Sequence, residues 1–145
     1  MELLIIVFLL GGLFLGWSLG ANDAANVFGT AVGTRMVSFK TAAIVCSLFV
    51  ILGAVISGAG TTETLGKLGA INALPGAFAA CIAAGISVYI MTKVGLPVST
   101  TQAIVGAIIG WNLYTGSSTN LQVLITIVMT WILCPIIAGV IAMGL

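Results

Sequence analysis

Residues 17–30, WSLGANDAANVFGT, place one carboxylate and two amides directly after an apolar segment, residues 3–19. At 1.5 Å per residue, that apolar segment together with the next few residues is just long enough to span a hydrocarbon core of about 30 Å. An ionised carboxylate inside lipid costs about 2.5–3.5 kcal/mol on insertion scales, so Asp23 is expected to face a cavity and to have a partner. This stretch therefore predicts a membrane protein that carries a polar site next to its first helix.

The composition of the whole chain indicates the same solvent. Of the 145 residues, 61% are hydrophobic and 5% are charged, and the mean hydropathy is +1.32. Soluble domains carry about 25% charged residues, so a water-facing surface cannot be built from this chain. A net charge of +1 offers no footprint for nucleic acid, which we do not expect as a partner. There is no histidine, and the three cysteines match no zinc or redox motif.

The hydropathy pattern predicts an all-α integral membrane protein with about five apolar segments in a single transmembrane domain, residues 1–145. Gly29 and Gly33 should interrupt or end the first helix, and Pro135 should kink or break the last. The fourth segment has fifteen residues and covers about 22 Å, which favours a short re-entrant half-helix over a full crossing. The apolar segments are residues 3–19, 41–59, 72–92, 98–112 and 121–145, with a polar connection at 60–71.

Basic residues predict the orientation of the chain. If the first three segments all cross, Arg35, Lys40 and Lys93 lie on one side and Lys67 lies on the other. The positive-inside rule then places residues 21–40 in the cytoplasm. We expect a multi-pass protein of the cell's inner (plasma) membrane.

Asn22, Asp23 and Asn26 form the first polar cluster. Asp23 and Asn26 are spaced i, i+3 and Asn22 and Asn26 are spaced i, i+4, so on a helical turn the three side chains converge. Carboxylate and amide oxygens suit a hard metal cation. No basic residue lies within eleven positions of Asp23, so its partner is either distant in sequence or a bound cation. The alternative is a polar cap where the first helix reaches the headgroups.

Ser99, Thr100, Thr101 and Gln102 form the second cluster, directly after Pro97. Proline followed by hydroxyl side chains is a typical start of a helix. The N-terminus of a helix presents unpaired N–H groups and a partial positive charge, which bind anions without a basic residue. Inside a membrane, such a half-helix start is a substrate site of transporters. The alternative is simple N-capping by Ser99 or Thr100.

The two clusters together resemble a known family. GANDAANVFGTAVGTR, residues 20–35, and GLPVSTTQAIVGAIIG, residues 95–110, resemble the first-half signatures of the inorganic phosphate transporter (PiT) family. TWILCPIIAGV, residues 130–140, resembles that family's Ser-Trp-x-x-Ser-Pro segment. Thr130 and Cys134 stand where serines are usual, so a substrate role does not carry over to these two positions.

The resemblance implies uptake of inorganic phosphate coupled to sodium ions or protons, with no other cofactor. Family members consist of two related halves with opposite membrane orientation, and this chain carries one copy of the Asn-Asp motif. It therefore resembles one half of an inverted-repeat transporter, with a second homologous half or a second copy of the chain as its partner in the lipid. By match, the substrate-binding residues are Asp23, Ser99, Thr100, Thr101 and Gln102, and the cation-binding residues are Asn22, Asp23, Asn26 and Ser99.

Three other functions are alternatives to phosphate transport. A scaffolding half or subunit of a membrane complex needs no carboxylate inside the membrane, so Asp23 argues against it. An ion channel usually lines a water path with rings of carbonyls or charges, which a single carboxylate beside a helix start does not provide. A membrane serine hydrolase fits least well, because Ser99 has no histidine to activate it and Lys93 is a poor base. We expect no enzyme.

Overall fold

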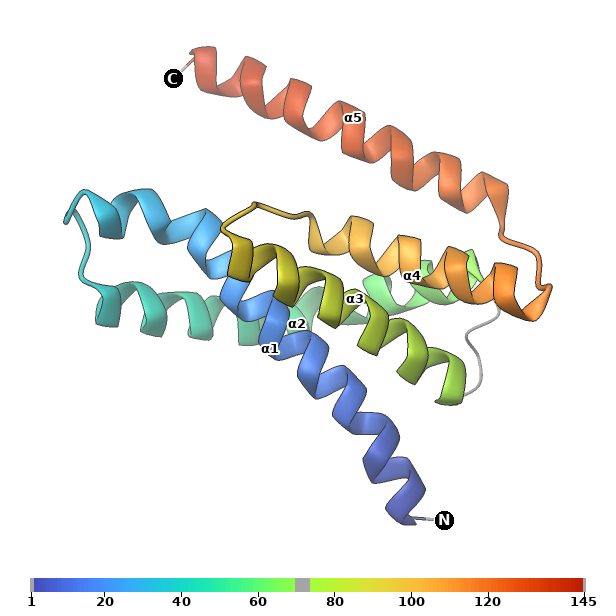
Figure 1. The fold of residues 1–145 in the computed structure, drawn as a ribbon. Helices are drawn as coiled ribbons and strands as arrows, with labels where there is room; N and C mark the ends of the chain where they lie inside the picture. The colour runs from blue at the N-terminus through green and yellow to red at the C-terminus, as the bar shows by residue number, and fades with distance from the viewer. Residues whose placement is uncertain (1, 70–73, 145) are drawn as a thin grey trace.

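The computed structural model describes residues 2–69 and 74–144, and within these ranges it contains helices and no strand (Figure 1). Four of the helices are long and apolar enough to cross a membrane, and large hydrophobic side chains are exposed on every helix. The expected all-α membrane fold is confirmed. In chain order the helices are α1 (Glu2–Gly33), α2 (Phe39–Leu68), α3 (Leu74–Val94), α4 (Thr100–Thr115) and α5 (Leu121–Gly144).

Helix α1 runs without interruption through the polar stretch, so the expected break before or at Gly29 is wrong. A single glycine costs only about 1 kcal/mol in a helix, whereas breaking the helix in lipid would leave several backbone groups unpaired. Gly33 is the last helical residue. Helix α2 then begins after Ser38, whose hydroxyl caps it by accepting a hydrogen bond from the Thr41 N–H at 3.2 Å.

Two further boundaries differ from the expectation. Residues 60–68 belong to α2 and not to a polar connection. Two of their hydroxyls are accommodated because they bond carbonyls of their own helix, Thr62 with Gly58 and Thr64 with Gly60, both at 3.0 Å. Helix α5 continues through Pro135. The remainder of the expected connection, residues 70 and 71, and the first two residues of the third apolar segment, 72 and 73, lie outside the described residues.

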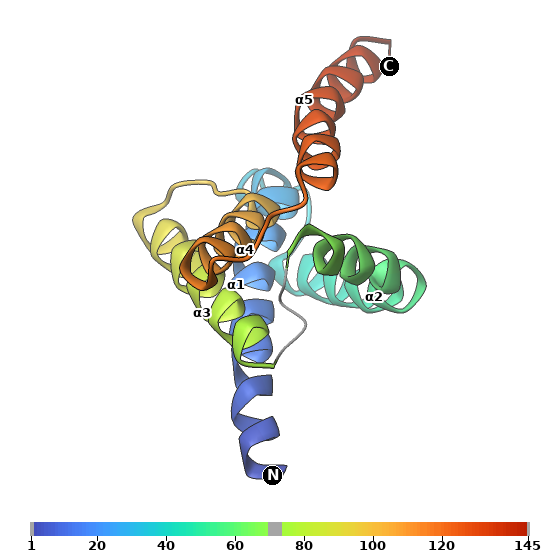
Figure 2. The same ribbon diagram turned by 90° about the vertical axis from the view of Figure 1, so that its right-hand side faces the viewer.

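Helices α3 and α4 form an antiparallel hairpin, and α1 packs along α3 in the same direction (Figures 1 and 2). Glycines on α3 permit both contacts. A Cβ added to Gly85 would lie 2.7 Å from a ring carbon of Phe14 on α1, and one added to Gly76 would lie 2.8 Å from Nε1 of Trp111 on α4. Side chains at either position would therefore push the helices apart.

Gly12, Gly16 and Gly20 recur every four residues on one face of α1, a spacing that lets membrane helices approach closely, and that face stays open. No atom of the described residues, apart from the glycines' own helix backbone and chain neighbours, lies within 4 Å of a Cβ built there. The face of α1 that contacts α3 is the one that contains Gly11, where an added Cβ would meet the ring of Phe78 at 2.7 Å.

The buried apolar cluster lies between α3, α4, the end of α2 and α5. Its buried members are Leu68, Ala80, Val105 and Ile108, and Trp131 of α5 packs against them. The backbone N–H of Asn120 bonds the Leu68 carbonyl at 3.0 Å and fixes the start of α5. Beyond this contact α5 leaves the other helices (Figure 2), and it contains no buried residue.

The turn between α3 and α4 places the second polar cluster against the first. Gly95 adopts a left-handed conformation with φ 77°, which glycine reaches at no steric cost. The N–H of Leu96 then bonds the Met91 carbonyl at 2.9 Å and closes the end of α3. The chain returns through Pro97, and this connection lies beside α1 at Asn22, eleven positions before α1 ends at Gly33.

Candidate functional site

Asn22 joins α1, α3 and the hairpin connection. Its side chain is 4% exposed. Its Nδ2 donates one hydrogen bond to the Val98 carbonyl at 3.0 Å and one to Oδ1 of Asp23 at 3.1 Å. Its Oδ1 lies 3.4 Å from the hydroxyl of Thr92 near the end of α3. Both amide hydrogens are therefore used, and the amide oxygen faces α3.

Asp23, on α1, faces the first turn of α4. Its Oδ2 is 3.4 Å from the hydroxyl of Thr100, and no described basic side chain forms an ion pair with it. The side chain is exposed in this chain, whereas the sequence indicated a buried carboxylate. The first N–H groups of α4 have no partner within the helix, so the carboxylate lies beside the positive end of a helix dipole.

Ser99 is the N-cap of α4. Its backbone is extended, and its hydroxyl accepts a hydrogen bond from the Gln102 N–H at 3.4 Å. The capping that sequence reasoning gave as the alternative is thus present. It leaves the hydroxyl proton of Ser99 available for an acceptor, because the cap uses an oxygen lone pair.

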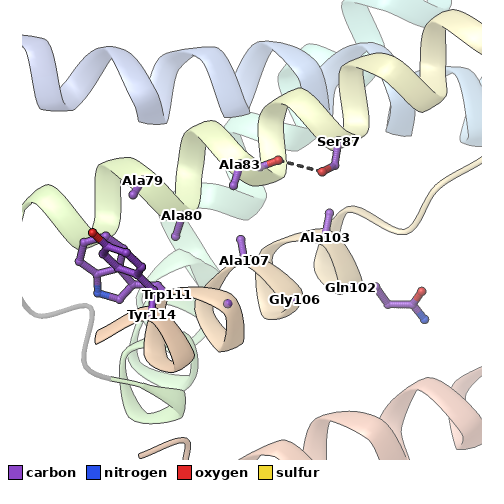
Figure 3. Close-up of a pocket in the computed structure, with 11 residues that line it drawn as sticks. Ala79, Ala80, Ala83, Ser87, Gln102, Ala103, Gly106, Ala107, Trp111 and Tyr114 are labelled. Carbon is purple, nitrogen blue, oxygen red and sulfur yellow. Dashed lines mark hydrogen bonds between the residues drawn. The ribbon is translucent and has the colours of Figure 1, made fainter. Parts of the chain in front are cut away.

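Thr101, Gln102 and Asn26 do not join Asp23 through any hydrogen bond that the described residues show. Thr101 lines a cavity of about 380 Å³ that also contacts Thr61 and Thr64 of α2. Gln102 lies at one end of a groove between α3 and α4 (Figure 3). Successive side chains of a helix point about 100° apart, so the side chains of four consecutive residues cannot all contact the same ligand. Asn26 is exposed on the next turn of α1.

The groove in Figure 3 has a volume of about 580 Å³ and a floor of small residues. Alanines of α3 face Gly106 and Gly110 of α4, and Trp111 and Tyr114 lie at the end opposite Gln102. A Cβ added to either of these glycines would meet no described atom within 4 Å. These two glycines, four residues apart on α4, therefore leave an open face within this chain.

Sequence reasoning missed Thr92 and the Val98 carbonyl. Thr92 is a single hydroxyl in an apolar segment, and nothing in its spacing connects it to Asn22, seventy positions earlier. A carbonyl carries no signal in a sequence. The residue that spacing could have found is Ser18, four positions before Asn22 and thus on the same face of α1.

The donor set of the site consists of oxygen atoms. Among the described residues, no group of three or more His, Cys, Asp or Glu side chains could hold a transition metal. The oxygens of Asn22, Asp23, Thr92 and Thr100 and the Val98 carbonyl suit a hard cation such as Na⁺. The start of α4, beside them, suits an anion. The arrangement therefore places a donor set of the hard-cation type beside a helix start of the anion-binding type.

Comparison with known proteins identifies the group to which the chain belongs. The model of the phosphate transporter family matches residues 19–145. This chain belongs to the phosphate transporter family. The resemblance to inorganic phosphate transporters is thereby confirmed, and the phosphate transporter family is a family of transporters and not of enzymes.

Individual members of the phosphate transporter family align with nearly the whole chain. A "putative phosphate permease" of Pyrococcus furiosus is 37% identical over 96% of this chain and 36% of its own length. A "sodium-dependent phosphate transporter" of Plasmodium falciparum is 35% identical over 87% of this chain and 20% of its own length. The chain thus spans about a third of the length of the archaeal phosphate permeases that it matches. No solved structure matches it.

Proposed function

We propose that this chain is one half of a secondary transporter that couples the uptake of inorganic phosphate to a cation, sodium or proton, across the plasma membrane. The observation that carries this proposal is the pair of contacts between the two polar clusters. Asn22 bonds the Val98 carbonyl across 76 positions of sequence, and Asp23 meets the Thr100 hydroxyl across 77. A cation-type set of oxygens and an anion-type helix start are thus neighbours.

The depth of the site supports this function. Arg35, next to the end of α1, belongs at the membrane surface. Asn22 lies eleven positions before Gly33, the last residue of α1, which is about 16 Å, or half of a hydrocarbon core of about 30 Å. The hairpin connection that touches Asn22 then lies near the middle of the membrane. In this arrangement α1, α2 and α5 cross, while α3 and α4 enter and return on one side.

Electrostatics in this site supplies the coupling. Asp23 and a phosphate at the start of α4 carry like charges and repel each other at short range in a low-dielectric site. A cation held by the Asp23 carboxylate and the Asn22 amide oxygen offsets that repulsion. Each ion therefore raises the affinity for the other, and this coupling is reciprocal. Asn26 and the Ser99 hydroxyl are further cation ligands in this proposal, and Ser99, Thr100, Thr101 and Gln102 bind phosphate.

Two features support a second homologous half, or a second copy, as the partner. The Gly12–Gly16–Gly20 face of α1 and the groove beside Gly106 and Gly110 are open within this chain. Small residues at such positions let membrane helices approach closely. A partner packed there would also cover the exposed carboxylate of Asp23 and complete a site at the interface of two repeats.

Uptake of labelled phosphate into liposomes tests the proposal. The protein expressed from its whole reading frame is reconstituted, and inward gradients of sodium, of protons or of potassium are imposed. We expect accumulation of phosphate above equilibrium with the sodium or the proton gradient and not with potassium. Equal entry of phosphate under all three gradients would indicate a channel. No entry of phosphate under any gradient, with correctly inserted protein, would indicate a scaffolding subunit instead.

A further inference from the structure

Ser18 has a buried hydroxyl without a partner. The residue is 2% exposed, and its Oγ makes no hydrogen bond among the described residues. Other hydroxyls in these helices bond the carbonyl four positions earlier, as Ser47 does with Ala43 at 2.8 Å and Ser87 with Ala83 at 2.9 Å. Ser18 does not use this option. A buried hydroxyl left unpaired is costly, so the oxygen is expected to serve a ligand.

The position of Ser18 indicates which ligand. Gly11, Leu15, Ser18 and Asn22 are the buried positions of α1 and follow one another at three or four residues, on the face that packs against α3. Ser18 therefore lies one turn before Asn22 in the dry interface. Both amide hydrogens of Asn22 are engaged, so its Oδ1 can only accept, and the one group that meets it among the described residues is the Thr92 hydroxyl at 3.4 Å.

The spacing of Asn22 Oδ1 and Thr92 Oγ1, one helical turn beyond Ser18, fits a metal ion. The Thr92 hydroxyl is 3.4 Å from Asn22 Oδ1, which exceeds the usual length of about 2.5–3.0 Å for an O–H···O hydrogen bond. Two oxygens that bind a cation at right angles, each about 2.4 Å from it, are about 3.4 Å apart. The pair thus has the separation of neighbouring ligands.

We infer that Ser18 Oγ, Asn22 Oδ1 and Thr92 Oγ1 are ligands of a sodium ion in the α1–α3 interface. The three groups do not titrate in the physiological range, so they can bind a metal ion but cannot take up a proton. One adjacent carboxylate, Asp23, balances one positive charge, which favours an alkali ion over a divalent one. This inference rests on the proposed function and specifies its coupling ion.

The test is Ser18→Ala in the transporter expressed from its whole reading frame. With saturating phosphate, the sodium concentration for half-maximal uptake is expected to rise about tenfold, because one ligand oxygen is lost. Ser47→Ala on α2 is the matched control. It removes a hydroxyl that its own helix already satisfies, and it should leave the sodium dependence unchanged.

Binding of ²²Na⁺ in detergent and the thermal unfolding of the same variants provide a readout without transport. Sodium should raise the unfolding temperature of the parent protein, and Ser18→Ala should lose most of that rise while its unfolding temperature without sodium stays the same. Equal sodium affinity in both serine variants would overturn the inference, and so would destabilisation of Ser18→Ala that is independent of sodium. Uptake driven by protons alone would overturn it too, while leaving cation-coupled phosphate transport in place. Absence of any cation dependence would contradict the proposed function itself.

Discussion

Asp23→Asn is expected to reduce cation-driven phosphate uptake about 100-fold or more. The substitution keeps the size of the side chain and removes its charge. Interactions of an ionised group with its ligands contribute about 1.5–3 kcal/mol each, and 1.4 kcal/mol corresponds to a factor of about ten. Because no described basic residue pairs with Asp23, its charge is free to hold the coupling cation. Initial rates of labelled phosphate uptake measure the effect.

Glu63→Gln is the control for the loss of an acidic side chain. Glu63 forms an exposed ion pair with Lys67 on α2 at 2.5 Å, and such pairs contribute about 0–1 kcal/mol. This variant should transport normally, and both variants should insert in the membrane in equal amounts. Near-normal sodium-dependent or proton-dependent uptake by Asp23→Asn would remove Asp23 from the cation site.

Phosphate and arsenate are expected to compete for the site, and sulfate is expected to compete poorly. Phosphate and sulfate have similar size and shape, but at neutral pH phosphate keeps at least one proton and sulfate keeps none. The start of α4 and the hydroxyls of Ser99, Thr100 and Thr101 can donate hydrogen bonds to either anion. The Asp23 carboxylate, which meets Thr100 at 3.4 Å, can only accept a hydrogen bond from a P–OH or As–OH group.

The size of this preference follows from the unpaired acceptor. Once the proposed partner half covers Asp23, an acceptor that faces only lone pairs costs about 1–3 kcal/mol, which corresponds to about a ten- to hundredfold preference for phosphate. Inhibition of labelled phosphate uptake by excess arsenate or sulfate measures it. If sulfate inhibits uptake as strongly as arsenate does, the site distinguishes anions only by charge and shape. The acceptor role of Asp23 would then have to be withdrawn.

The sequence predicts the helices well because lipid imposes a simple rule. Long apolar runs such as residues 41–59 must be helical to pair their backbone groups, and α2 contains that run. The same rule explains the error at Gly29. Local glycine and asparagine signals indicated a break in α1, but the need to pair backbone groups inside the membrane holds the helix together as far as Gly33.

The contacts of the site could be predicted only in part. The residue types at Asp23 and Thr100 indicated a cation site and an anion site, but not that Thr100 would be the neighbour of Asp23. That contact depends on the Gly95 turn and on which face of α1 packs against α3. The four-residue spacing of Gly12, Gly16 and Gly20 indicates one packing face of α1, but the face that contacts α3 is the one that contains Gly11. Thr92 joins the site through packing alone.

Modification of a cysteine at position 99 tests most directly whether the hairpin connection and Asn22–Asp23 form one ion-binding site inside the membrane. Ser99→Cys is introduced after Cys46, Cys81 and Cys134 have been replaced, with Ser118→Cys in the exposed α4–α5 connection as the control. The rate of reaction with a water-soluble thiol reagent is measured from each face. We predict slow labelling at position 99 that phosphate and the coupling cation together slow further, and fast labelling at position 118 that neither ion changes. Labelling of position 99 as fast as position 118, and indifferent to both ions, would contradict a shared site at this depth.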